Sequence, residues 1–184
     1  MPSDFRLIIF ALLWVLLAGS ADALCGDAST HSADNISVGA STALSARIAE
    51  LIAEVEKDVG DVPVQQVADL RDADRSGLIL VDARSQAERD VSVIAGAVAL
   101  AELEQSRPIP NTRVIVYCTI GLRSGKAVRA LRARGFDAFN LRGGVLAWLA
   151  AGGAMVDTKG KPTQRVHVYG TRWNAVPASF IPVW

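Results

Sequence analysis

Two short, continuous runs of apolar residues constrain the fold of this chain more than any other feature. They are LILVD at residues 78–82 and RVIVYC at residues 113–118. Parallel strands that are buried on both faces have this pattern, whereas a strand with one solvent-exposed face alternates apolar and polar residues. The other strand candidates are residues 93–100, interrupted by Gly96, and DAFNL at residues 137–141.

Segments of helical character separate and follow these strands. We expect a short helix within residues 63–77, a helical turn at 85–90, and longer helices at 124–135 and 143–153. Glycines stand at the ends of the two longer helices, as is usual for helix termini. Strands that alternate with helices indicate an α/β fold with a mainly parallel sheet.

The N-terminus has the pattern of an export signal. Arg6 precedes an apolar stretch at residues 7–19, and Ala-Asp-Ala follows at 21–23. A charged start, an apolar middle and an A-x-A site predict a signal peptide at residues 1–23, cleaved after Ala23. A membrane-spanning helix needs about 20 apolar residues, more than this stretch offers. We therefore expect an exported, periplasmic protein, with an uncleaved N-terminal membrane anchor as the alternative.

Export bears on the two cysteines, Cys25 and Cys118. An oxidising compartment permits a disulfide between them, so a structural bridge, or a transient one in which Cys25 resolves an oxidised Cys118, is an alternative. Cys25 begins a small and polar stretch that we expect to be flexible, and a bridge from it would organise no core. Residues 24–61 are thus expected to hold a flexible segment followed by an amphipathic helix.

That helix is predicted at residues 41–58, where one face is apolar; its apolar members are Leu44, Ile48, Leu51, Ile52 and Val55. We expect this face to pack on the domain, and a dimer interface is the alternative. At the other end, residues 154–184 form an aromatic-rich extension, and such aromatics usually bury against a domain surface. His167 is expected on the polar face of a short strand. Neither it nor His31 has neighbours at metal-ligand spacing, so no metal site is predicted.

Cys118 stands where a predicted strand ends, just before a helix expected to begin near Ser124. In open α/β sheets, ligands bind outside the carboxyl ends of the strands. The intervening TIGLR segment can turn its N–H groups inward, with Gly121 free to take a left-handed conformation. These amides, the positive helix terminus and Arg123 favour an anion at the sulfur, and hence the reactive thiolate. We predict that Cys118 is a nucleophile; a buried inert cysteine is the alternative.

Charge is uneven along the chain although its formal net charge is zero. Residues 118–142 hold six basic side chains against the single acid Asp137. This excess favours an anion-attracting field near Cys118, and the alternative is the solvated face of one helix. The zero net charge gives no general preference for nucleic acid, and none is predicted as a partner.

Three ordered motifs resemble those of the rhodanese-like sulfurtransferases: VDARSQAER at 81–89, CTIGLRS at 118–124 and NLRGGVLAW at 140–148. The resemblance covers about residues 62–153 and implies a three-layer fold with a mainly parallel central sheet flanked by helices. It implies that Cys118 accepts sulfur and cycles between thiol and persulfide. It also implies a cradle for the substrate anion made by the amides of Thr119, Ile120, Gly121, Leu122 and Arg123.

By the same resemblance, Asp82 and Arg84 support the site by ion pairing, and Trp148 packs under the loop. Two departures from the family pattern concern other positions. VIAGA at residues 93–97 stands where the family commonly has HIPGA, which removes a loop-ordering histidine. Thr119 follows the cysteine where thiosulfate-using members often carry a basic residue, so less positive charge faces a dianionic donor.

The spacing from Cys118 to Arg123 also separates this chain from the related phosphatases. Their pattern is Cys-x5-Arg, and the shorter Cys-x4-Arg here suits a sulfur-sized ligand rather than a phosphate. No evident loop acid is available to protonate a phosphoester leaving group. We predict a sulfurtransferase without cofactor or metal, moving sulfur from a small thiosulfate-like anion to a thiol or a cyanide-like acceptor. The alternative is a non-enzymatic sulfur carrier or binding module with an envelope protein as partner.

Overall fold

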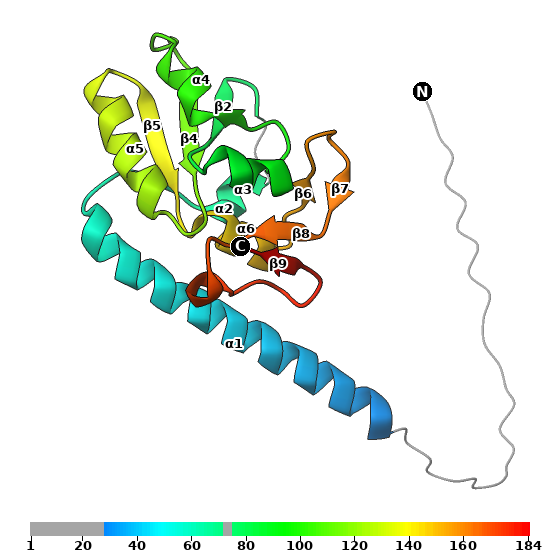
Figure 1. Ribbon diagram of the computed structural model, residues 1–184. Coiled ribbons are helices and arrows are strands. Elements are labelled where there is room, and N and C mark those ends of the chain that lie inside the picture. Colours follow the sequence, from blue (N-terminus) through cyan, green and yellow to red (C-terminus); the bar gives the residue numbers. More distant parts are fainter. Residues whose placement is uncertain (1–27, 72–74) are drawn as a thin grey trace, which may run out of the picture.

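The computed structural model describes residues 28–71 and 75–184, so the predicted signal peptide and Cys25 lie outside the described residues. A parallel five-stranded sheet forms the centre, in the order β1-β5-β4-β2-β3 (Figure 1). Its strands are β1 (Val64–Gln65), β2 (Leu78–Asp82), β3 (Val98–Ala99), β4 (Arg113–Tyr117) and β5 (Asp137–Leu141). The predicted α/β fold with a mainly parallel sheet is confirmed.

Alternate side chains along the central strands enter two separate cores, which explains why the runs are continuously apolar. Leu80, Ile115 and Tyr117 face one core, while Val81 and Val116 face the other. A period of two residues puts successive side chains on opposite faces of a strand. Both faces are therefore covered, as a parallel sheet requires.

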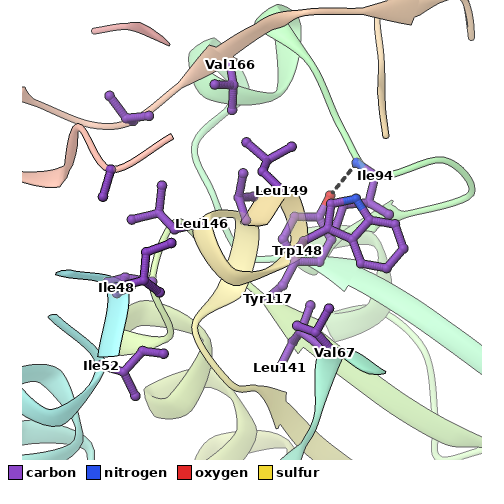
Figure 2. Packing of buried hydrophobic residues seen from close by; sticks show 14 of the residues in the cluster. Ile48, Ile52, Val67, Ile94, Tyr117, Leu141, Leu146, Trp148, Leu149 and Val166 are labelled. Carbon is purple, nitrogen blue, oxygen red and sulfur yellow. Dashed lines mark hydrogen bonds between the residues drawn. The ribbon is translucent and has the colours of Figure 1, made fainter. Parts of the chain in front are cut away.

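Helices form the two outer layers. The core that contains Val81 and Val116 is closed by α4 (Leu100–Glu104) and α5 (Leu122–Ala133). The opposite core is closed by α2 (Val67–Arg71) and α6 (Gly144–Ala150). Figure 2 shows the second core around Tyr117 and Trp148, with Leu146 and Leu149 of α6 beside them. The result is the expected three-layer arrangement.

A long helix, α1 (Ala28–Val59), runs across the bottom of the domain in Figure 1. Its apolar face packs on α5 and α6, with Ile48, Leu51, Ile52 and Val55 buried in the core. The predicted stripe at 41–58 thus covers this chain's own domain. The helix also extends back to Ala28, over a segment expected to be flexible, because lengthening an existing helix orders one residue at a time and avoids a new nucleus.

The C-terminal extension is built from short elements that lie against the domain. A hairpin pairs β6 (Met155–Val156) with β7 (Pro162–Thr163), and a second small sheet pairs β8 (Arg165–His167) with β9 (Ile181–Val183). Between β8 and β9 along the chain, η1 (Thr171–Trp173) forms a single 3-10 turn. Val166 and Val168 are fully buried, and α3 (Gln86–Val91) contacts β8. Most of the extension is thereby tied to the domain.

Two predicted elements differ from the structure. Residues 63–77 do not form one helix, because β1 occupies Val64–Gln65 before α2 begins. An edge strand of two residues is too short to produce a periodic pattern. In the segment 93–100, only Val98–Ala99 is a strand of the central sheet. Gly96 takes a left-handed φ of 79° and turns the chain before that strand.

Candidate active site

The segment after β4 forms a tight loop around the sulfur of Cys118. Gly121 has a φ of 116°, a conformation that favours glycine, and it caps α5, which begins at Leu122. Its N–H donates to Cys118 Sγ at 3.2 Å. The first N–H groups of a helix have no acceptor within the helix, so they and the helix dipole favour negative charge here. Cys118 is buried, with 1% of its surface exposed.

The N-terminus of α6 holds this loop from the other side. The N–H groups of Val145 and Leu146 donate to the carbonyls of Cys118 (2.9 Å) and Thr119 (3.1 Å). Such close approach depends on Gly144, which has a φ of 49°; a Cβ there would lie 2.2 Å from the Cys118 carbonyl oxygen. The glycines of the NLRGGVLAW motif thus determine how closely α6 meets the cysteine loop.

Asn140 and Ser124 complete the support of the loop. The Asn140 amide donates to the Gly121 carbonyl at 3.0 Å and accepts from Ser124 Oγ at 2.7 Å. Ser124 Oγ also lies 3.4 Å from Cys118 Sγ. A serine hydroxyl has one proton, and the short contact to an oxygen that can only accept uses it. Toward Cys118, the Ser124 oxygen is therefore free to act as a hydrogen-bond acceptor for the thiol S–H.

A buried carboxylate, Glu88, faces the loop from α3. Its two oxygens accept from Arg123 Nη1 and Nη2 at 2.6 and 2.7 Å, a bidentate pair. Thr119 Oγ1 lies 3.4 Å from the same carboxylate and accepts from Arg123 Nη2 at 3.2 Å. The side chain of Glu88 is 2% exposed and that of Arg123 is 34% exposed. The Arg123 side chain thus reaches the pocket while the buried Glu88 carboxylate holds its guanidinium group in place.

The charge of Glu88 follows from these contacts. Burial alone would raise its pKa, but hydrogen bonds from Arg123 and Ser85, with the guanidinium charge, outweigh burial and lower the pKa to about 2. The hydrogen bond to Glu88 raises the pKa of Arg123 against the effect of burial, and a negative charge on Cys118 raises it further. Glu88 and Arg123 are therefore an ionised pair at neutral pH.

Sequence reasoning missed Glu88, although a local signal was present. Ser85 caps α3 and Glu88 is the third residue of the helix, so S-x-x-E forms a capping box. That pattern is recognisable in sequence. It places the carboxylate at the start of the helix, and only the tertiary structure shows that Arg123 lies opposite.

Asp82 and Arg84 form a second pair, which lies wholly inside the protein. Arg84 donates to both carboxylate oxygens of Asp82, with contacts down to 2.7 Å, and to the Ser92 carbonyl at 2.6 Å. Both side chains are fully buried. The guanidinium also lies 5.6 Å from the centre of the Tyr117 ring. This pair holds the end of β2 to Ser92, which follows α3, and lies beside Tyr117 at the end of β4.

Trp148 of α6 is a core residue in the structure. It is 6% exposed and lies beside Tyr117 in Figure 2, while its Nε1 donates to the Ala154 carbonyl at 2.9 Å. The Tyr117 hydroxyl accepts from the Ile94 N–H at 3.1 Å. The adjacent Val93 exchanges two backbone hydrogen bonds with Val156, at 2.8 and 2.9 Å. The VIAGA segment is therefore ordered by backbone pairing with the C-terminal extension.

The basic cluster at residues 118–142 reaches the Cys118 pocket through Arg123. Apart from Arg123, its arginines are engaged elsewhere, with the Val59 carbonyl (Arg129), Asp137 and the Ala138 carbonyl (Arg132), the Glu104 and Ser106 carbonyls (Arg134) and Glu56 (Arg142). These contacts account for the positions of the four arginines, and an anion-attracting field near Cys118 stays a prediction. The four arginines connect α5 and β5 to neighbouring segments.

A pocket of about 120 Å³ opens over the sulfur. Its lining is Cys118, Thr119, Ile120, Leu122 and Arg123 from the loop, with Tyr169 and Trp173 from the C-terminal extension. The Tyr169 ring covers the Arg123 guanidinium at 5.0 Å. Tyr169 is 64% exposed, so the expectation that the aromatics bury against the domain is wrong for it, as it is for Trp184. Sequence reasoning had no signal that placed the extension at the site.

Residues 28–71 and 75–184 contain no group of three or more His, Cys, Asp or Glu side chains arranged to hold a metal ion. Within the same ranges, no helix has the length and apolar character needed to span a bilayer.

Comparisons with known proteins agree with the resemblance that the motifs predicted. The model of the rhodanese-like domain family matches residues 63–151. A sulfurtransferase from Allochromatium vinosum is 36% identical over 94 residues, covering 48% of this chain and 87% of that protein. The chain belongs to the rhodanese-like domain family.

Other relatives match over the same region. The probable adenylyltransferase/sulfurtransferase MoeZ from Mycobacterium tuberculosis is 37% identical over 89 residues, covering 44% of this chain and 23% of that protein. The chain thus corresponds to less than a quarter of this larger relative. Among solved structures, a rhodanese-related protein from Thermoplasma volcanium is 24% identical, with a TM-score of 0.45, covering 52% of this chain and 98% of that one.

Proposed function

We propose that this protein is a sulfurtransferase in which Cys118 carries sulfane sulfur as a persulfide. The observation that supports this most is the hydrogen bond from the Gly121 N–H to Cys118 Sγ, at the N-terminus of α5. Backbone donors and a helix terminus stabilise a thiolate, which is the nucleophilic form of cysteine. The naming of the Allochromatium vinosum relative as a sulfurtransferase gives independent support.

The first step moves one sulfur atom onto the enzyme. The Cys118 thiolate attacks the outer sulfur of a thiosulfate-like donor, a new S–S bond forms, and the donor's S–S bond breaks. The electron pair of the broken bond leaves with the sulfite. The persulfide keeps one negative charge, to which the N–H groups of the loop can donate hydrogen bonds, as the Gly121 N–H does to Cys118 Sγ. Arg123, at the pocket wall, is paired with Glu88 and can still donate a hydrogen bond to the departing anion through an N–H that Glu88 does not take.

The second step returns the enzyme to its starting state. A thiol or cyanide attacks the terminal sulfur of the persulfide, and the Cys118 thiolate is the leaving group. The two half-reactions share the enzyme persulfide, so ping-pong kinetics are expected. On the protein's side, both steps use only side chains and backbone amides of the loop from Cys118 to Arg123.

Steady-state transfer from thiosulfate to cyanide tests the proposal. Many thiocyanate molecules per chain and an intact mass increased by one sulfur after thiosulfate treatment are the expected results. One persulfide per chain without turnover would indicate a sulfur carrier instead. Neither turnover nor added sulfur would contradict both functions.

We further propose that the protein is exported and loses residues 1–23, on the sequence pattern alone. N-terminal sequencing of the protein from its native envelope should begin at Leu24. A chain that retains Met1 in the membrane fraction would replace secretion by anchoring.

A further inference from the structure

The wall of the Cys118 pocket that faces the loop comes from outside the family match. The family model ends at residue 151, whereas Tyr169 and Trp173 lie beyond it and line the pocket. Ile120 and Leu122 line the pocket from the loop. Beside the polar Thr119 and Arg123, the surfaces that meet a donor next to the sulfur are therefore two aromatic rings and two aliphatic side chains.

The net positive charge of this pocket is smaller than the presence of Arg123 alone would suggest. Both terminal nitrogens of Arg123 are hydrogen-bonded to Glu88, which is ionised, so the pair carries no net charge. Thr119, which follows the cysteine, contacts the same pair through its hydroxyl. One face of the guanidinium is covered by the Tyr169 ring. A dianion entering this pocket would lose water without a full positive charge to replace it.

The backbone at Tyr169 is held in an unfavourable conformation. Its φ is 67°, in the left-handed region that bulky residues rarely adopt. The Tyr169 N–H donates to His167 Nδ1 at 3.0 Å, and its ring is held over Arg123. At η1, Arg172 pairs with Glu54 of α1, so the turn that carries Trp173 is tied to the long helix. The extension thus presents both rings from a supported backbone.

We infer that the pocket selects sulfane donors that carry an aromatic or short apolar group and a single negative charge, such as organic thiosulfonates. An apolar cavity of about 150 Å³ holds benzene in another protein, and this pocket of about 120 Å³, open to solvent, suits one ring or a short alkyl group. The inference rests on the proposed function and specifies its donor.

The chemical step is the same as with thiosulfate but has a different leaving group. The Cys118 thiolate attacks the terminal sulfur of R–SO2–S⁻, and the bond between the two donor sulfurs breaks. The electron pair goes to the sulfinate R–SO2⁻, and the enzyme keeps the persulfide anion. Two negative charges are present before and after the step. The R group lies between Tyr169, Trp173 and the aliphatic side chains.

Three donors separate the effect of the ring from the effect of charge. Benzenethiosulfonate and methanethiosulfonate differ in the ring, and methanethiosulfonate and thiosulfate differ in charge. The full-length protein is assayed with cyanide as acceptor, and each kcat/KM is divided by the rate constant of the same donor with free cysteine. The expected order is benzenethiosulfonate, methanethiosulfonate, thiosulfate. Each aromatic contact is expected to contribute a factor of about 2 to 12.

Variants of the two rings test whether the extension causes the preference. Tyr169→Ala and Trp173→Ala should each lower the ratio of kcat/KM for benzenethiosulfonate over methanethiosulfonate about threefold to tenfold. Trp184→Ala is the matched control, an exposed aromatic of the same extension that does not line the pocket, and it should leave the ratio unchanged. Tyr169 is largely exposed, so its variant keeps the test valid even if Trp173→Ala lowers Tm strongly.

Two results would overturn the inference and leave sulfur transfer standing: a normalised preference for thiosulfate over both thiosulfonates, or an unchanged ratio in Tyr169→Ala. No transfer from any of the three donors would remove the proposed function together with the inference. The two failures are therefore distinguishable.

Discussion

The two sides of the Cys118 pocket are held in different ways. On the loop side, the carbonyls of Cys118 and Thr119 accept from α6, and Asn140 and Ser124 contact the turn from within the core. On the other side, Tyr169 is largely exposed and rests on a short turn tied down by a surface ion pair. Surface ion pairs contribute little to stability, whereas buried hydrogen-bond networks are costly to break. The reacting sulfur is thus held by buried hydrogen bonds, whereas the wall facing it is supported by contacts at the surface.

The largest effect is expected at the sulfur itself. Cys118→Ser should abolish persulfide formation and transfer, because a serine hydroxyl cannot carry sulfane sulfur. Cys25→Ser should leave both near the wild-type level, measured as thiocyanate production and intact mass. Equal losses in the two variants would instead support a redox pair of cysteines.

Gly144→Ala tests how much the loop side depends on close packing. The added Cβ would lie 2.2 Å from the Cys118 carbonyl oxygen and would force a left-handed residue, so the loss in unfolding free energy should exceed about 3 kcal/mol. Gly160→Ala is the matched control, since its φ is 76° and no atom lies within 4 Å of the added Cβ. It should cost about 1–2 kcal/mol from strain alone.

Urea denaturation of both glycine variants provides the measurement. If they lose the same stability, backbone strain would account for the effect and the contact with α6 would be unimportant. If Gly144→Ala loses much more, the contact between α6 and the cysteine loop is the cause.

Arg123→Ala should lower kcat/KM about tenfold to a hundredfold, because a hydrogen bond to a charged group contributes about 1.5–3 kcal/mol. Removal of Arg123 leaves Glu88 buried without its partner, so Tm should fall as well. Lys126→Ala is the control, since an exposed charge contributes little.

Activity per folded molecule separates the two roles of Arg123. A lower Tm with unchanged kcat/KM would make Arg123 purely structural, and the loop amides alone would hold the anion. A loss of rate in Lys126→Ala as large as in Arg123→Ala would indicate a diffuse charge effect.

Glu88→Gln is expected to have the smallest effect at neutral pH, about 1–2 kcal/mol of unfolding free energy, since the amide still accepts one hydrogen bond. The pH dependence is more specific. The pKa of Glu88 is lowered from 4.5 to about 2 in the folded protein, so its contribution is present above about pH 4.5 and is lost as the pH falls toward 2. The stability difference between wild type and variant should shrink across that window. A constant difference from pH 7 to pH 2 would contradict the ionised pair.

Much of the fold and part of the site could be predicted from local sequence. The apolar runs at 78–82 and 113–118 were sufficient to predict a parallel sheet, because a strand buried on both faces shows no alternation of apolar and polar residues. Cys118 and Gly121 were identifiable because a loop between a strand end and a helix start is contiguous in the chain. β1 was missed, since two residues at a sheet edge have no period.

Only the tertiary structure decided which distant residues complete the pocket. Glu88 reaches Arg123 because α3 packs beside the loop. The arginines at 129, 132, 134 and 142 contact other segments instead. Tyr169 and Trp173 arrive from beyond the family domain through β8 and η1. Sequence periodicity reports only which face of an element is apolar. The side chains that meet across elements depend on how those elements pack, and that determined the neutral charge and aromatic wall of this site.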